Sequence, residues 1–128
     1  MLKARQAIEQ AILSVTPSID TQFENATYSP KEGVPYQQLH FIPAHPASIA
    51  IDDNIAEHSG VFQITLRYPA GRGVKDALAR AESYAKVFYA GAKFDEVYII
   101  APCSVNILGV DGDRYGVAVS IYFKTYEE

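Results

Sequence analysis

The segment Gly71-Arg72-Gly73 has residue types that could bind an anion, because it lies between a predicted strand and a predicted helix. Backbone N–H groups at a helix start, together with the helix dipole, can hold a phosphate. The dinucleotide fingerprint G-x-G-x-x-G needs glycine or alanine at position 76, where this sequence has Asp76. That carboxylate would repel a pyrophosphate, so we predict a strand-to-helix turn here and no nucleotide site.

Histidines and carboxylates in the middle of the chain are the second group that could do chemistry. They are His40, His45 and His58, with Asp52, Asp53 and Glu57. Imidazole and carboxylate groups suit divalent transition metals. The candidates lie in or beside a predicted loop, and no two of the histidines have the i,i+4 or H-x-H spacing that places ligands on one face of an element. We therefore predict no metal site and no cofactor.

Nucleophilic catalysis finds no support in the sequence. Cys103, the single cysteine, follows Ala101-Pro102 at a predicted strand end, where a buried structural thiol is the usual role. No serine lies in a G-x-S-x-G elbow, and Asp111-Gly112-Asp113 lacks the further ligands of a calcium loop. Enzymes need convergent polar groups of tuned acidity, so the sequence predicts a protein that is not an enzyme.

Length and composition indicate one globular domain over residues 1–128. The chain is 48% hydrophobic and 20% charged, an ordinary balance for a single core. Its net charge is −4, and its 11 basic residues are scattered, whereas nucleic-acid binding needs a clustered positive face. No apolar run approaches the ~20 residues of a membrane-spanning helix. The first residues lack the apolar segment of a secretory signal, so we expect folding in a cytoplasm.

Two segments have the periodicity of amphipathic helices. The first spans residues 2–15 and ends at Thr16-Pro17, because a residue before proline is pushed out of the helical region. The second spans residues 74–89 and is followed by Gly91, a natural C-terminal cap. Asp76 and Arg80 are expected to pair on its solvent side at i,i+4 spacing. Apolar stripes define the buried faces: Ala4, Ile8, Ala11, Ile12 and Val15 in one, and Val74, Ala77, Leu78, Ala81, Ala85 and Phe88 in the other.

Further segments have strand character, at residues 36–42, 61–68, 96–101, 104–110 and 114–126. Asp111-Gly112-Asp113 is a hairpin turn signal between the last two. In the final strand, alternation predicts that Val117, Val119, Ile121 and Phe123 face the core, and that Ala118, Ser120, Tyr122 and Lys124 face outward. The order α-β-β-α-β-β predicts an α+β fold with a mainly antiparallel four- to five-stranded sheet and both helices on one face.

Residues 44–60 are predicted to form a mobile loop or arm. The segment has few large side chains and is too long for a tight turn, and loops of this length are usually functional or mobile. Its isoleucines suit an arm that becomes ordered against a partner. Nine tyrosines without any tryptophan add surface suited to protein contact.

A series of short motifs extends along nearly the whole chain. In order, they are Lys3-Ala4-Arg5-Gln6-Ala7-Ile8, Phe23-Glu24-Asn25, residues 29–36, Pro43, Gly60-Val61-Phe62-Gln63-Ile64, residues 68–73, Pro102, Ser104 and Asp111-Gly112-Asp113-Arg114-Tyr115. In this order and spacing they resemble the small tail-terminator (tail-completion, or minor tail) proteins of long-tailed bacteriophages. The stretch Phe94 to Ala101 departs from the resemblance, because it is more apolar and less glycine-rich than expected of that family.

The resemblance implies a structural protein of the virion tail, assembled in the cytoplasm of the bacterial host. Such proteins form a ring, typically a hexamer, that caps the completed tail tube, ends its polymerisation and presents a surface to the head-completion protein. The expected partners are therefore copies of itself, the tail tube protein and the head-completion protein, with no specific nucleic acid and no membrane. On this basis the residues predicted to make ring and tube contacts are Ile49, Ile51, Asp52, Asp53, Ile55, Arg72, Arg114 and Tyr122.

Two alternatives stay open at this point. The chain could be another neck or head–tail connector protein of the virion, which rings formed with tube protein would distinguish. It could also be a small anion- or nucleotide-binding α+β domain that uses the helix start after Gly73.

Overall fold

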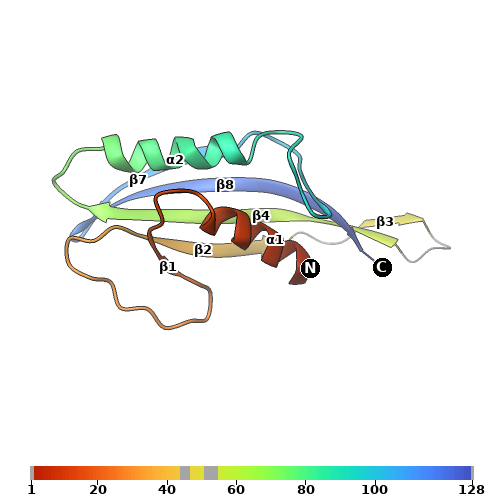
Figure 1. The fold of residues 1–128 in the computed structure, drawn as a ribbon, viewed down its shortest axis with the longest axis horizontal. Coiled ribbons are helices and arrows are strands. Elements are labelled where there is room, and N and C mark those ends of the chain that lie inside the picture. Colours follow the sequence, from red (N-terminus) through yellow and green to blue (C-terminus); the bar gives the residue numbers. More distant parts are fainter. Residues whose placement is uncertain (1, 44–46, 51–54, 128) are drawn as a thin grey trace.

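Ten helices and strands make up the part of the chain that the structure describes (Figure 1). The structure is a computed structural model and describes residues 2–43, 47–50 and 55–127. Its two helices are α1 (Leu2–Leu13) and α2 (Lys75–Val87). The strands are β1 (Asp20–Gln22), β2 (Tyr36–Pro43), β3 (Ala47–Ala50), β4 (Ile55–Pro69), β5 (Lys93–Phe94), β6 (Val97–Ile99), β7 (Ser104–Asp111) and β8 (Arg114–Glu127).

All eight strands belong to one twisted sheet. Its main path runs β1-β2-β4-β8-β6-β5, with β3 paired to β4 and β7 paired to β8. The pair β1–β2 is parallel, and the other pairs are antiparallel. The α+β class is right, but the predicted mainly antiparallel sheet of four to five strands is wrong, because the sheet is mixed and has eight strands. The short strands β1, β3 and β5 have too few residues to show an alternating pattern in sequence.

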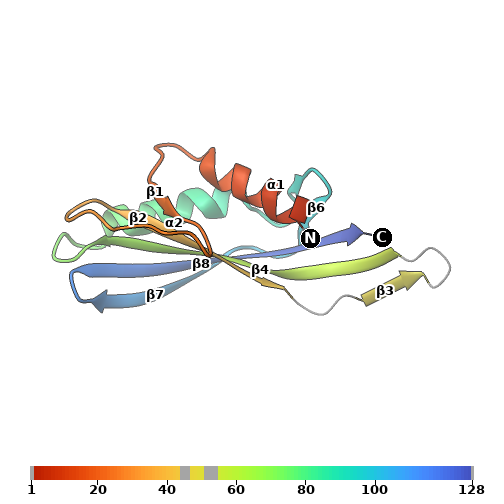
Figure 2. The same cartoon turned by 90° about the horizontal axis from the view of Figure 1, so that it is seen from below.

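Both helices lie on the same face of the sheet, as Figure 2 shows. α2 packs on the central strands β4 and β8, and α1 packs near β5 and β6. The helix-free face of the sheet has no covering layer among the described residues. The core lies between helices and sheet, and its largest side chains are Ile8, Ile12, Leu39, Phe62, Ile64, Leu66, Tyr84, Phe88, Ile99, Ile121 and Phe123.

Helix α1 buries three residues of its predicted stripe, Ala4, Ile8 and Ile12, together with Ala7. It ends at Leu13, two residues before the predicted end at residue 15. On the opposite side, Nε of Arg5 donates to the Glu9 carboxylate at 3.0 Å across one helical turn. The apolar spacing therefore positions this helix as the sequence predicts.

Arg80 of α2 points into the protein, contrary to the expectation that it would pair with Asp76 on the solvent side. It is only 6% exposed, and its guanidinium donates to the hydroxyl of Tyr84 at 2.9 and 3.1 Å and to the backbone carbonyl of Pro17. The Tyr84 hydroxyl donates to Gln37, whose amide donates to Thr21 on β1 at 2.9 Å. This buried chain of hydrogen bonds ties α2 to β2 and β1. It explains how a three-residue parallel strand is held in place.

Burial raises the pKa of the Tyr84 hydroxyl, and the neighbouring Arg80 charge lowers it in part. The hydroxyl therefore keeps its proton and remains a donor to Gln37 over the ordinary pH range. No carboxylate contacts the Arg80 guanidinium in the hydrogen bonds of this network. The charge of Arg80 is balanced by oxygen dipoles and by the Tyr84 ring, whose centroid lies 4.9 Å away.

The strand β8 is the centre of the sheet and follows the predicted alternation on its core side. Val117, Val119, Ile121 and Phe123 are fully buried. Ala118, predicted to face outward, is also buried, between Thr65 on β4 and Asn106 on β7 in its cross-strand row. Neighbouring strands on both sides therefore cover this small side chain.

Candidate interaction surfaces

The predicted contact residues fall at opposite ends of the molecule (Figures 1 and 2). One end, called here the turn end, holds the connections of residues 69–74 and 111–113. The other end, called the arm end, holds β3, the start of β4, and the Leu2 and Glu127 ends of the described chain. Arg72 and Arg114 lie at the turn end, and the described residues of β3 and of the start of β4 lie at the arm end. The two groups are therefore not one surface.

The 44–60 segment is strand where the structure describes it. β3 pairs antiparallel with residues 55–57 of β4, and β4 begins at Ile55 rather than near Val61 as predicted. Ile49 belongs to β3, and Ile55 is the first residue of β4. Ile51, Asp52 and Asp53 lie outside the described residues.

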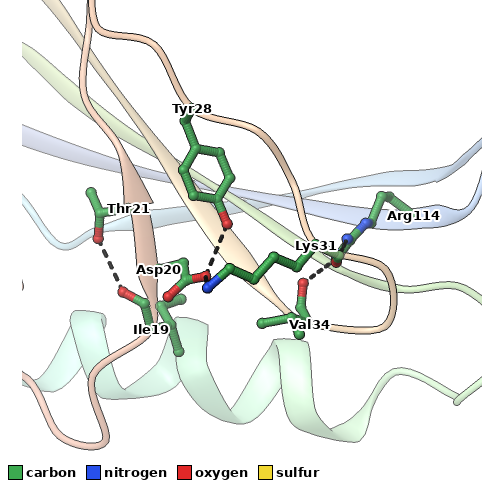
Figure 3. A network of polar contacts seen from close by, with 7 residues as sticks. All are labelled: Ile19, Asp20, Thr21, Tyr28, Lys31, Val34 and Arg114. Atoms are coloured by element: carbon green, nitrogen blue, oxygen red, sulfur yellow. Dashed lines mark hydrogen bonds and ion pairs between the residues drawn. The ribbon is translucent and has the colours of Figure 1, made fainter.

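Arg114 joins the turn end to the long connection between β1 and β2 (Figure 3). It is 7% exposed, and its guanidinium donates to the backbone carbonyls of Lys31, at 2.6 Å, and of Val34. The same guanidinium lies over the ring of Tyr36, 5.0 Å from the centroid. On the other side of this connection, Tyr28 donates to Asp20 at 3.0 Å. Arg114 thus stabilises the 23–35 connection from within its own chain.

Replacing Arg114 by alanine should lower the free energy of unfolding by about 2 kcal/mol, because two backbone carbonyls lose a charged donor. Thermal unfolding measures this effect, and the rate of tryptic cleavage after Lys31 reports the release of the connection. The matched control is Arg72→Ala, an exposed arginine at the same end, expected to change stability by less than about 0.5 kcal/mol. Equal stability of the two variants would show that the Arg114 contacts contribute nothing.

Arg72 is exposed in a turn shaped by two glycines in the left-handed region, Gly71 at φ 82° and Gly73 at φ 77°. The predicted strand-to-helix turn is therefore present. A hollow of about 130 Å³ beside it is lined by Arg72, Asp76 and Tyr68, among others. The Asp76 carboxylate shares this hollow with the start of α2, which disfavours a phosphate there.

Tyr122 lies on the helix-free face of the sheet and is half-buried. Its hydroxyl is 2.7 Å from the hydroxyl of Ser104 on β7. The side chain therefore links β8 to β7 while part of its ring remains accessible. It belongs to neither end of the molecule.

A larger groove of about 770 Å³ lies between α1 and the strands at the arm end. Its walls include Leu2, Gln10, Glu96, Val97 and Tyr126. Lys3, Asp95 and Thr125 also line this groove, which is open to solvent.

The residues considered for chemistry are dispersed. Within the described residues, no three His, Cys, Asp or Glu side chains are grouped closely enough to hold a metal ion; His45 lies outside those residues. Cys103 is half-buried, its thiol donates to the Phe88 carbonyl at 3.4 Å, and burial raises its pKa to about 11. A thiol of that pKa is almost entirely protonated at neutral pH and is a poor nucleophile.

The strand β7 was predicted from the sequence, but its exposed apolar side chains were not. Seven of its eight residues are exposed, including Val105, Ile107, Leu108 and Val110 at 42%, 61%, 49% and 67%. β7 pairs with β8 on one side only, and no described strand pairs with its other side. Four large apolar residues without a charge between Ser104 and Val110 were the available signal. Natural proteins use charged residues or proline to protect open strand edges from pairing. The β7 edge has neither between Ser104 and Val110.

No helix among the described residues is both long and apolar enough to cross a membrane.

The chain is similar to a known protein family and to a solved structure. A family model described as phage tail terminator protein matches residues 3–123. A solved structure superposes with a TM-score of 0.72 at 22% identity, covering 94% of this chain and 92% of its own. That likeness shows a shared fold. No curated protein sequence matches the chain. Since the family model spans all but a few residues, this chain belongs to the phage tail terminator family.

Proposed function

We propose that this protein caps the tail tube as a ring of six copies, ends tube polymerisation and presents a joining surface to the head-completion protein. Family membership supports a structural role in the tail. The observation that carries the ring is the open apolar edge of β7, which needs a partner to be covered. A repeated edge contact between identical subunits is heterologous, and it closes into a ring when the rotation between subunits closes.

The side chains on the helix-free face of the sheet suit the wall of a channel through which DNA passes. Its side chains in the middle of the sheet are mainly uncharged amides and hydroxyls, such as Gln38, Gln63, Thr65, Ser120 and Tyr122. Six copies at a net charge of −4 each carry −24, and a negative ring does not grip DNA that passes through it. We therefore assign this face to the channel and the helices to the outside.

The arm end is assigned to contact with the tube or with the adjacent subunit. β3 and the first residues of β4 project beyond the helix layer in Figure 2. The segment that contains Ile49, Ile51, Asp52, Asp53 and Ile55 is the proposed contact there. Arg72 is exposed at the opposite end of the molecule. We propose that it contacts the component that lies on the other side of the ring.

Deletion of residues 46–57 should leave a folded protein that no longer caps tubes. The deletion removes β3 and the start of β4 but retains the paired region from Gly60 to Pro69 and the core beneath α2. Tail lengths measured by electron microscopy should become longer and more variable with the deletion variant, while thermal unfolding stays cooperative. A matched control is Glu82→Ala on the exposed side of α2, which should terminate tails at normal length. Normal tail length with the deletion variant would refute the arm assignment.

A head–tail connector role makes a different prediction for the same samples. A connector would join heads to tails, and tubes assembled with it and without it would have the same length. Rings seen by electron microscopy at tube ends, with uniform tube length, support termination. Rings that bind only heads would refute it.

A further inference from the structure

The cross-strand rows of the sheet end on β7 at one edge and on β1 at the other. Successive Cα partners connect Asn106 through Ala118, Thr65 and Gln38 to Gln22, and the next row connects Ile107 through Val117, Leu66 and Gln37 to Thr21. A third row runs from Gly109 to Asp20. The two edges therefore lie at the same level along the strand direction.

Strand direction also matches between these two edges. β2 and β8 run one way and β4 and β7 run the other, because each pair along the path is antiparallel. β1 is parallel to β2 and so runs opposite to β7. Rotation about an axis along the strands keeps strand direction, so the β1 edge of one copy would meet the β7 edge of the next as an antiparallel pair.

The remaining part of the β2 edge is blocked, which favours β1 as the acceptor. Beyond β1, the backbone N–H of Phe41 donates to the carboxylate of Glu24, and the guanidinium of Arg5 lies 3.3 Å from that carboxylate. Side-chain capping of this kind protects an edge from pairing with another chain. The β1 residues Asp20, Thr21 and Gln22 are half-exposed, and no described strand pairs with their outer side.

Charge is compatible with contact between two acidic copies. Between Ser104 and Val110 the β7 edge has no ionisable residue, and its one acid, Asp111, is exposed at the turn end. On the β1 edge, Asp20 lies 3.9 Å from the ammonium of Lys31, whose side chain is 72% exposed. Lys31 reaches Asp20 from the connection that Arg114 holds at the turn end (Figure 3). It can therefore attract Asp111 of a neighbour.

From these features we infer that β7 of one copy pairs with β1 of the next copy, forming a continuous sheet around the ring. The inference rests on the proposed ring and specifies its subunit contact. Asn106 then faces Gln22 of the neighbour on the helix-free side, and Ile107 faces Thr21 on the helix side. Exposed Val105 and Ile107 become covered at the boundary between copies.

Cysteine cross-linking of capped tails tests this contact. In a Cys103→Ser background, the pair N106C and Q22C should give a ladder of covalent multimers under mild oxidation, and each single variant should not. The control pair N106C and E82C, with position 82 on the outside of α2, should give no ladder. If the two strands pair with a shift of one pair of rows, a bifunctional thiol reagent long enough to span neighbouring rows still joins the cysteines at positions 106 and 22.

A charge on the edge supplies a second measurement. Ile107→Lys should reduce the fraction of capped tubes on the order of tenfold, because it buries an unpaired ammonium at each contact. Tyr89→Lys, at an equally exposed aromatic residue on the helix side, should leave capping unchanged. Circular dichroism should show both variants folded.

The outcomes separate the contact from the proposed function. Capped tails with a ladder from the paired cysteines support the inference. Normally capped tails without a ladder, or full capping by Ile107→Lys, overturn the β7–β1 contact and leave the ring in place. Failure of the unaltered protein to cap tubes overturns the proposed function itself.

Discussion

Replacing Arg80 by alanine should lower the free energy of unfolding by about 3 kcal/mol. The change leaves the Pro17 carbonyl without its charged donor and opens a space beside the buried Tyr84 ring. Loss of buried charged hydrogen bonds and of packed volume is among the costliest kinds of single substitution. For a domain of this size, the expected fall in Tm is about 10 °C. Calorimetry or thermal circular dichroism measures it.

Two further variants identify the cause of the Arg80 effect. Arg80→Met keeps most of the volume and loses the hydrogen bonds, so it should be intermediate between Arg80→Ala and the unaltered protein. Glu82→Ala, two residues along the same helix and exposed, should change stability by less than about 0.5 kcal/mol. If Arg80→Ala were no less stable than Glu82→Ala, the buried network would not hold α2 to the sheet.

Replacing Phe62 by alanine should lower the free energy of unfolding by about 4 kcal/mol, the largest effect expected from one substitution in this chain. Phe62 is fully buried in β4 and packs edge-on against Phe41, with ring centroids 6.0 Å apart. It lies in the same cross-strand row as Ile121 of β8, at the centre of the core. Chemical denaturation followed by intrinsic tyrosine fluorescence, since the chain has no tryptophan, or by circular dichroism, gives the free energy of unfolding.

The conservative control for Phe62 is Phe62→Leu, which retains most of the apolar volume and should cost less than half as much. Phe23→Ala removes an aromatic side chain that is 37% exposed and should cost about 1 kcal/mol or less. A loss at Phe62 no larger than at Phe23 would contradict the placement of β4 at the centre of the core.

Helices and long strands were predictable from the sequence because their apolar spacing repeats over several turns or pairs. The α1 stripe that ends in Ile12 and the β8 alternation from Val117 to Phe123 both appear as predicted. The hairpin turn at Gly112, with φ 61°, also follows from its residue types. The local apolar pattern is sufficient to predict a helix or strand when that element presents one face to the core.

Features that depend on partners distant in the sequence could not be predicted. β1 is held in place by Gln37, whose amide donates to Thr21, and Gln37 in turn accepts from the hydroxyl of Tyr84, far along the chain. Arg80 was expected on the surface because i,i+4 spacing to Asp76 is a local rule, whereas its carbonyl partner on Pro17 is 63 residues away. The contact role of the arm residues remains a prediction. The open apolar edge of β7 was identified only from the exposure of its side chains in the structure.

The central position of β8 has a consequence for synthesis of the protein. β4 pairs along its length with residues 114–127, so the middle of the sheet joins segments that are more than 40 residues apart. Topologies dominated by such distant pairings fold slowly. Until residues 114–127 have been made, β4 has β2 beside Phe62 and Ile64 but lacks its partner β8 on the other side. A nascent chain therefore exposes one unpaired edge of an apolar strand, and holdase chaperones are the expected means of keeping it from aggregating.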